Sequence, residues 1–296
     1  MLTEQERAYL DALAKAPIPT DVMGLRTAME TFAPMMNANP PEIGALHEAV
    51  ELRPGLNADV AVPKGSGPFP VVVYLHGGGW IGGSPKTHRK LGMQFADAGY
   101  LTINVDYRLA PEHPFPAGLE DCVHAVKWAG ENAKRWNGDA SRLAVGGDSA
   151  GGNLTAATVT SLAAEKYAGP AKPKAALLIY GLFDFPAMLK IDTNAALEGM
   201  VKAYAGAGYP AILEDPRVSP LRAVKPGAMP PSFIICGTAD TLLPEARAMA
   251  DALKRADIRH EVAIFEDMPH GFLQMDVLSG CKQGLDRMFD FLRRTI

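Results

Sequence analysis

The chain has 296 residues, of which 48% are hydrophobic and 21% charged, and its formal net charge is −4. This length and apolar content suit a large buried core, either as one α/β domain or as a domain with an added subdomain. The small acidic net charge comes with no basic block for phosphate groups, so we expect a globular protein that does not bind nucleic acid.

The N-terminal residues predict two helices. Thr3 followed by Glu6 fits a capping box, and a second helical pattern carries a methionine-rich apolar stripe from Met23 to Met36. Such a stripe is most often ordinary core, but methionine also adapts its shape to what it touches, so a flexible wall over a pocket is the alternative. The chain start lacks the features of a secretory signal, and no apolar run approaches the ~18 residues of a membrane span. We expect a cytoplasmic protein without a membrane span.

After residue 45, a hairpin pattern around Pro54 and Gly55 precedes a regular alternation of apolar runs and helical segments. The apolar runs lie at 71–75, 101–105, 143–145, 175–180, 233–236 and 262–265. Such alternation predicts an α/β fold with a mostly parallel sheet and helices on both of its faces.

A long segment between Tyr180 and Phe233 contains no clear strand. A structureless loop of that length would be unusual, so we expect it to form a small subdomain. We assign residues 1–45 and 183–218 to a helical cap, and residues 46–182 and 219–296 to the main α/β domain.

The stretch from Leu143 to Thr155 reads as strand, sharp turn and helix. Its centre, Gly147-Asp148-Ser149-Ala150-Gly151, matches the nucleophile elbow G-x-S-x-G, which exposes a serine hydroxyl at a strained turn. The following helix directs unpaired N–H groups toward the same point, where an oxyanion could be held. A glycine-rich turn with an idle serine is the alternative.

Serine needs a base to accept its proton, and His270 is the histidine that follows Ser149 in the chain and also follows the carboxyl end of a predicted strand. The same two criteria select Asp240 as the acid that orients the base. Glu266 and Asp267 are rival acids, but they are so close to His270 in sequence that their geometry would be awkward.

The segment 76–79 (HGGG) follows another predicted strand. As an oxyanion loop, Gly77, Gly78 and Gly79 would supply two backbone N–H donors, joined by that of Ala150. The same glycines with Gly82 also match a dinucleotide fingerprint, with Asp106 as the ribose ligand. That alternative leaves the serine, histidine and aspartate unexplained and places a bulky tryptophan beside the pyrophosphate.

Further candidates for substrate contact are Trp80, Asp148, Met35 and Met36. The three cysteines, Cys122, Cys236 and Cys281, are far apart and form no metal-binding motif, so we expect buried free thiols and no metal site.

Several motifs occur together in this chain, namely HGGGW at 76–80, VDYRLAPEHPFPA at 105–117, GGDSAGGN at 146–153, SPL at 219–221, GTADTL at 237–242 and HGF at 270–272. Together they resemble the bacterial hormone-sensitive-lipase-like esterases of the α/β-hydrolase fold. The resemblance implies an eight-stranded, mostly parallel sheet under a helical cap, no cofactor, and hydrolysis of carboxylic esters through an acyl-enzyme. It also makes a homodimer possible, because members of the family often pair through the last strand and helix.

We therefore predict a carboxylesterase that acts on small-molecule esters with short to medium acyl chains. An amidase or deacetylase of the same fold is an alternative, since acyl transfer to water uses the same groups. The second alternative is a protein that binds a small apolar ligand without catalysis.

Overall fold

The computed structural model describes residues 2–15, 19, 21–192 and 194–296. Within them, eight strands form one sheet in the order β1-β2-β4-β3-β5-β6-β7-β8. The strands are β1 (Ala45–Arg53), β2 (Leu56–Val62), β3 (Phe69–Leu75), β4 (Leu101–Asp106), β5 (Gly138–Asp148), β6 (Ala175–Ile179), β7 (Ser232–Gly237) and β8 (His260–Phe265). Strand β2 is antiparallel to β1 and β4, and all other neighbours are parallel. The predicted α/β fold and the predicted hairpin are confirmed.

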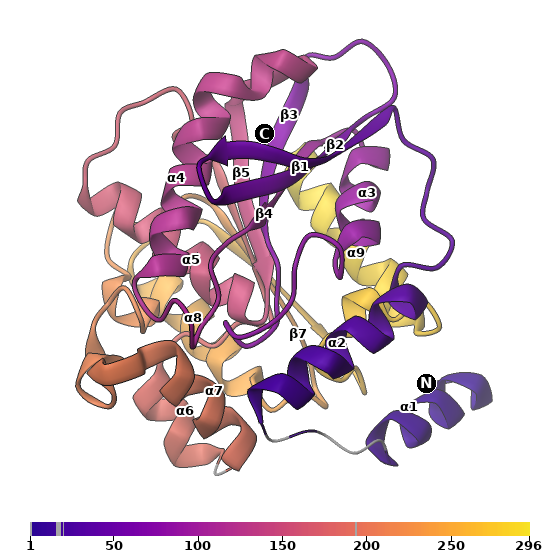
Figure 1. Cartoon of the computed structure of the whole chain (residues 1–296), viewed down its shortest axis with the longest axis vertical. Coiled ribbons are helices and arrows are strands. Elements are labelled where there is room, and N and C mark those ends of the chain that lie inside the picture. Colours follow the sequence, from indigo (N-terminus) through magenta and orange to yellow (C-terminus); the bar gives the residue numbers. More distant parts are fainter. Residues whose placement is uncertain (1, 16–18, 20, 193) are drawn as a thin grey trace.

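Helices cover both faces of the sheet, because its central strands are apolar on both sides. Every residue of β6 is buried, and so is the run from Val71 to Leu75 in β3. Figure 1 shows α4 (Ala117–Asn132), α5 (Ala150–Ala164) and α8 (Leu243–Arg255) on one side and α3 (Arg89–Asp97) and α9 (Ser279–Arg293) on the other. Phe95 of α3 meets Phe289 of α9 edge to face, with ring centroids 5.2 Å apart.

The segment between β6 and β7 contains α6 (Phe185–Ile191) and α7 (Ala195–Ala205), and its described residues form no strand. Helix α2 (Val22–Met36) lies at the same end of the molecule (Figure 1). Short 3₁₀ helices lie at Ala133–Trp136, Gly206–Gly208, Ala211–Glu214, Pro220–Ala223 and Phe272–Gln274.

Helix α1 (Glu4–Lys15) begins with the predicted capping box: the Thr3 amide donates to Glu6 Oε2 (2.7 Å) and the Glu6 amide to Thr3 Oγ1 (3.2 Å). Glu6 Oε1 also accepts from the Ser279 amide at 2.6 Å, which connects α1 to the start of α9. Hydrogen bonds from Ser279 and Thr3 lower the pKa of Glu6 from 4.5 to about 2. The carboxylate therefore caps two helices.

Helix α2 contains no buried residue. The interpretation of its methionine-rich stripe as ordinary core is therefore wrong, and the alternative of a wall over a pocket fits the structure. Arg26 connects α2 to the main domain, because its guanidinium donates to the carbonyls of Ile81 (2.5 Å) and Ala110 (2.9 Å) and to both carboxylate oxygens of Glu112. The helix is thus held by polar contacts while its apolar face stays free.

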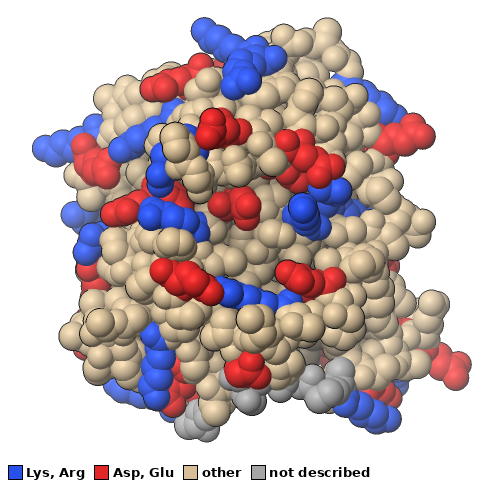
Figure 2. All heavy atoms as spheres, in the orientation of Figure 1, with Lys and Arg blue, Asp and Glu red and all other residues tan. Residues whose placement is uncertain are grey.

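Charged side chains of both signs are interspersed over the face shown in Figure 2, with no large area of one sign. Among the described residues, no helix is long and apolar enough to cross a bilayer.

Candidate active site

Ser149 lies at the turn between β5 and α5, with φ 55° and ψ −117°. Two glycines permit this turn, because a Cβ on Gly147 would lie 2.5 Å from the Gly151 carbonyl oxygen and a Cβ on Gly151 would collide with the Leu75 carbonyl. The left-handed backbone at a non-glycine residue is the strained conformation expected of a nucleophile elbow.

The structure brings the hydroxyl, imidazole and carboxylate of Ser149, His270 and Asp240 together. His270 Nε2 lies 2.8 Å from Ser149 Oγ, and His270 Nδ1 lies 2.8 Å from Asp240 Oδ2. The second oxygen of Asp240 accepts from the Leu242 amide at 2.8 Å, which orients the carboxylate. Asp240, rather than its rivals Glu266 and Asp267, accepts the histidine hydrogen bond.

Opposing effects act on the imidazole. Burial lowers the pKa of His270. The charge and hydrogen bond of Asp240 and the charge of Asp148 raise this pKa by more than burial lowers it, so the pKa of His270 lies above the ordinary 6.5. The Tyr180 ring and the imidazole also pack in a T-shaped arrangement, with ring centroids 4.9 Å apart. A carboxylate at this position can stabilise an imidazolium.

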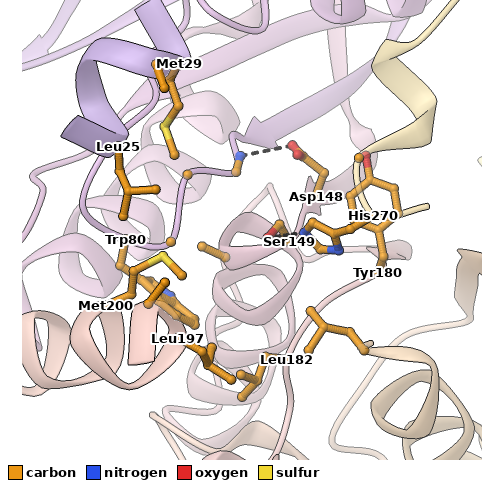
Figure 3. Close-up of a pocket in the computed structure, with 18 of the residues that line it drawn as sticks. Leu25, Met29, Trp80, Asp148, Ser149, Tyr180, Leu182, Leu197, Met200 and His270 are labelled. Atoms are coloured by element: carbon orange, nitrogen blue, oxygen red, sulfur yellow. Dashed lines mark hydrogen bonds between the residues drawn. The ribbon is translucent and has the colours of Figure 1, made fainter. Parts of the chain in front are cut away.

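The glycine loop follows β3 and faces the serine. The Gly77 amide donates to Asp148 Oδ1 at 3.0 Å (Figure 3), so it is not free for an oxyanion and its inclusion among the donors is corrected. Within the described chain, the amides of Gly78, Gly79 and Ala150 donate to no protein acceptor. The chain pairs Gly77 with a carboxylate that lies 71 residues away, which sequence spacing could not reveal.

A cavity of about 560 Å³ opens beside Ser149. Figure 3 shows Leu25 and Met29 of α2 and Met200 of α7 across this cavity from His270 and Tyr180. Its other apolar lining residues include Leu13, Pro19, Ala28, Phe32, Met36, Trp80, Leu182, Ala196, Leu197 and Leu242. The volume is typical of small-molecule sites.

The four further candidates for substrate contact differ in whether they line the cavity. Trp80 and Met36 line the cavity. Met35 does not line it and is 53% exposed, because it lies about 100° around the helix from Met36. Asp148 also lines the cavity, so its contact with substrate stays a prediction, and its oxygens bond to Tyr74, Gly77 and His88.

Sequence reasoning missed the cavity residues of α7 and the end of β6. Tyr180 and Leu182 follow a strand in the same way as the other site residues, so the rule applied elsewhere could have found them. Leu197 and Met200 carried no such signal, because their helix contacts the cavity only through the tertiary fold.

The dinucleotide alternative is not supported by the local structure. The fingerprint requires a helix to open at the glycines, whereas residues 76–88 form loop and turns and α3 begins only at Arg89. Cys122, Cys236 and Cys281 are buried free thiols, as predicted. Among the described residues, no group of three or more His, Cys, Asp or Glu side chains could hold a metal ion.

Comparison with known proteins assigns the chain to a family. A family model described as the alpha/beta hydrolase fold matches residues 72–274, more than half of the chain. The chain belongs to this family. Its fold, an eight-stranded and mostly parallel sheet with flanking helices, is that of an α/β hydrolase.

Two curated relatives of the chain are named as ester hydrolases. The carboxylic ester hydrolase LipN of Mycobacterium tuberculosis is 36% identical over 74% of this chain and 61% of its own length. The ethyl acetate hydrolase of Pseudomonas putida is 32% identical over 75% of this chain and 72% of its own. The chain thus spans about three fifths of LipN.

Solved structures extend the likeness over the whole chain. An esterase of the bacterial hormone-sensitive lipase family is 32% identical with a TM-score of 0.81, and the match covers 100% of both chains. An esterase of Pyrobaculum calidifontis is 27% identical with a TM-score of 0.88, covering 97% of each chain. The resemblance to hormone-sensitive-lipase-like esterases is confirmed.

Proposed function

We propose that this protein is a serine carboxylesterase that hydrolyses small-molecule esters through an acyl-enzyme. The observation that carries the proposal is the pair of 2.8 Å contacts joining Ser149, His270 and Asp240 beside amides that have no protein acceptor. The esterase relatives support the same reaction.

In the acylation step, Ser149 Oγ attacks the ester carbonyl carbon while His270 Nε2 accepts the hydroxyl proton. Asp240 stabilises the resulting imidazolium, and the amides of Gly78, Gly79 and Ala150 donate to the carbonyl oxygen as it gains negative charge. His270 then donates its proton to the departing alkoxide, which leaves as the alcohol. In the second half, water adds to the acyl-enzyme with His270 as base and releases the carboxylic acid and Ser149.

The substrate preference follows from the cavity. Its lining is mainly apolar, and the described residues that line it include neither lysine nor arginine, which favours uncharged esters with short to medium acyl chains. We also propose that residues 1–45 and 183–218 act as the cap, since α2 and α7 supply much of this lining. The homodimer and the cytoplasmic location stay predictions.

The decisive experiment is hydrolysis of p-nitrophenyl esters from acetyl to decanoyl by the wild-type protein and by Ser149→Ala. We expect wild-type turnover that is greatest with short to medium chains, and a loss in kcat of about 10⁴- to 10⁶-fold in the variant. Substantial activity in Ser149→Ala would contradict the proposal. The matched p-nitroanilides tell an esterase from an amidase.

A further inference from the structure

The oxyanion loop has little regular structure to hold it. Residues 76–83 belong to no helix or strand, and Gly78 and Gly79 have φ values of 126° and 60°. Inside the loop, the amides of Ile81 and Gly82 donate to the Gly78 carbonyl at 3.1 and 2.9 Å. These contacts shape the turn but do not fix it relative to Ser149, so an outside contact must set the direction of its free amides.

Other parts of the chain contact this loop at Trp80 and Ile81, but the contact made to a glycine amide of the loop is that of the Asp148 carboxylate. Asp148 is 4% exposed, and its Oδ1 accepts from the Gly77 amide at 3.0 Å and from the Tyr74 hydroxyl at 2.8 Å. A Cβ on Gly77 would lie 2.5 Å from Asp148 Oδ2, so the loop rests directly on the carboxylate. Because Asp148 immediately precedes Ser149, this contact ties the donors to the nucleophile.

A buried histidine holds the carboxylate from the other side. His88 Nε2 lies 3.3 Å from Asp148 Oδ2, and His88 Nδ1 lies 2.8 Å from Thr87 Oγ1. His88 is 7% exposed and immediately precedes α3, so a helix of the main domain anchors it. Burial raises the pKa of Asp148, but its interactions with His88 and the hydrogen bond from Tyr74 outweigh burial, so this pKa lies below the usual value of an aspartate.

We propose that His88 and Asp148 are positioning residues that hold the oxyanion loop through the Gly77 amide, so that the Gly78 and Gly79 amides meet the oxyanion. This inference rests on the proposed esterase function. Both residues line the cavity, but the Asp148 carboxylate already accepts from the Gly77 amide and lies against His88, so we assign their effect to the loop. Their removal therefore weakens stabilisation of the transition state more than binding of the ester.

The test compares Asp148→Ala, His88→Leu and His88→Gln with the wild type. In Asp148→Ala and His88→Leu we expect kcat to fall about 10- to 100-fold while KM changes by less than about threefold, because donors are misdirected rather than removed. His88→Gln places an amide nitrogen near the position of Nε2 and should restore part of the loss. If Asp148→Ala does not fold, the two His88 variants still decide the matter.

The Ki of a reversible trifluoromethyl ketone distinguishes a positioning role from a merely structural one. The ketone forms a tetrahedral adduct with serine, so its Ki should rise in proportion to the loss of kcat/KM, while the Ki of the product alcohol should not change. Asp121→Asn is the matched control, since Asp121 is another buried carboxylate but pairs with Arg53 and Arg108. It should lower Tm without lowering kcat per titrated active site.

Unchanged kcat and unchanged ketone affinity in both Asp148→Ala and His88→Leu would overturn the positioning role. Equal losses for ketone and alcohol binding would overturn it too, because they indicate a disordered site. Failure of the esterase proposal itself has a different signature, namely no turnover by the wild type or none lost in Ser149→Ala.

Discussion

At the scale of the residue, the geometry of the site depends on which partner each carboxylate oxygen accepts a hydrogen bond from. Asp240 uses one oxygen for His270 and the other for the Leu242 amide, so the carboxylate cannot rotate away from the imidazole. Asp148 has an equally buried carboxylate, but its donors are structural. In the proposed reaction, we therefore expect Asp240 to support proton transfer and Asp148 to support charge stabilisation.

The raised pKa of His270 predicts the acid side of the pH profile. Protonated His270 cannot accept the serine proton, so kcat/KM should fall as the pH falls through the histidine pKa. Because Asp240 and Asp148 raise that pKa, the half-point of the acidic limb should lie above 6.5. The measurement is kcat/KM for a p-nitrophenyl ester against pH, corrected for ionisation of the released phenol.

Asp240→Asn tests the cause of this shift. Loss of the carboxylate charge should move the acidic limb to lower pH and reduce kcat by about 10⁴-fold, because the neutral amide does not stabilise the imidazolium. A wild-type limb at or below 6.5 would contradict the interpretation.

At the scale of the element, α2 combines rigid attachment with an adaptable inner face. Arg26 attaches its first turns, and Asn37 attaches its end, accepting from the Lys90 amide and donating to the Lys86 carbonyl, each at 2.8 Å. Between these anchors, Met29 and its apolar neighbours line the cavity. We therefore expect the flexible side chains on this fixed helix to accommodate acyl chains of several lengths.

Met29→Ala should change the acyl-chain preference. Removing the side chain enlarges the cavity beside the glycine loop, where a Cβ on Gly82 would lie 2.8 Å from Met29 Sδ. We expect the optimum among p-nitrophenyl esters to move toward longer chains. The ratio of kcat/KM for a longer ester to that for a shorter ester should rise about tenfold, because the enlarged cavity accommodates a few more methylene groups.

Met35→Ala is the matched control on the same helix. Met35 is exposed and lies outside the cavity, so its chain-length profile should equal that of the wild type. A shift in Met35→Ala, or none in Met29→Ala, would show that this face of α2 does not contact the acyl group.

At the scale of the whole molecule, the site is assembled where α5 approaches the sheet closely at Gly147 and Gly151. Strand β5 lies between β3 and β6, and α5 crosses it on small residues that are buried from Ala150 to Thr160. Close packing allows Ser149 to sit beside the loops that follow β3, β7 and β8. The same packing makes the elbow sensitive to added volume.

A pair of glycine substitutions tests this sensitivity. In Gly151→Ala the new Cβ would collide with the Leu75 carbonyl, which is backbone of β3 and cannot shift without disturbing the sheet. The free energy of unfolding should therefore fall by about 3 kcal/mol. In Gly92→Ala, within α3, the Cβ would meet only Asn104 at 3.8 Å and Thr102 at 4.0 Å. This variant should be up to about 1 kcal/mol more stable.

Urea unfolding followed by circular dichroism measures both changes. Equal stability of Gly151→Ala and the wild type would contradict the close approach of α5 to β3. A destabilised Gly92→Ala would contradict the ordinary van der Waals distances from Gly92 to Asn104 and Thr102.

The sequence by itself determined the alternation of strands and helices, the turn at Ser149, and the choice of His270 and Asp240 as partners. These features are local or follow chain order, because short stretches of sequence are enough to show periodicity, turn chemistry and the ends of parallel strands. The catalytic roles of the three residues stay predictions.

The tertiary structure alone decided which side of α2 faces the cavity and which glycine amide is free. The apolar residues of α2 surround much of the helix, so periodicity could not choose Met36 over Met35. The Gly77 amide is taken by Asp148, and Met200 meets Gly79, through contacts between distant segments. Such contacts exist only after the sheet has closed and the helices have packed on it, so no local pattern encodes them.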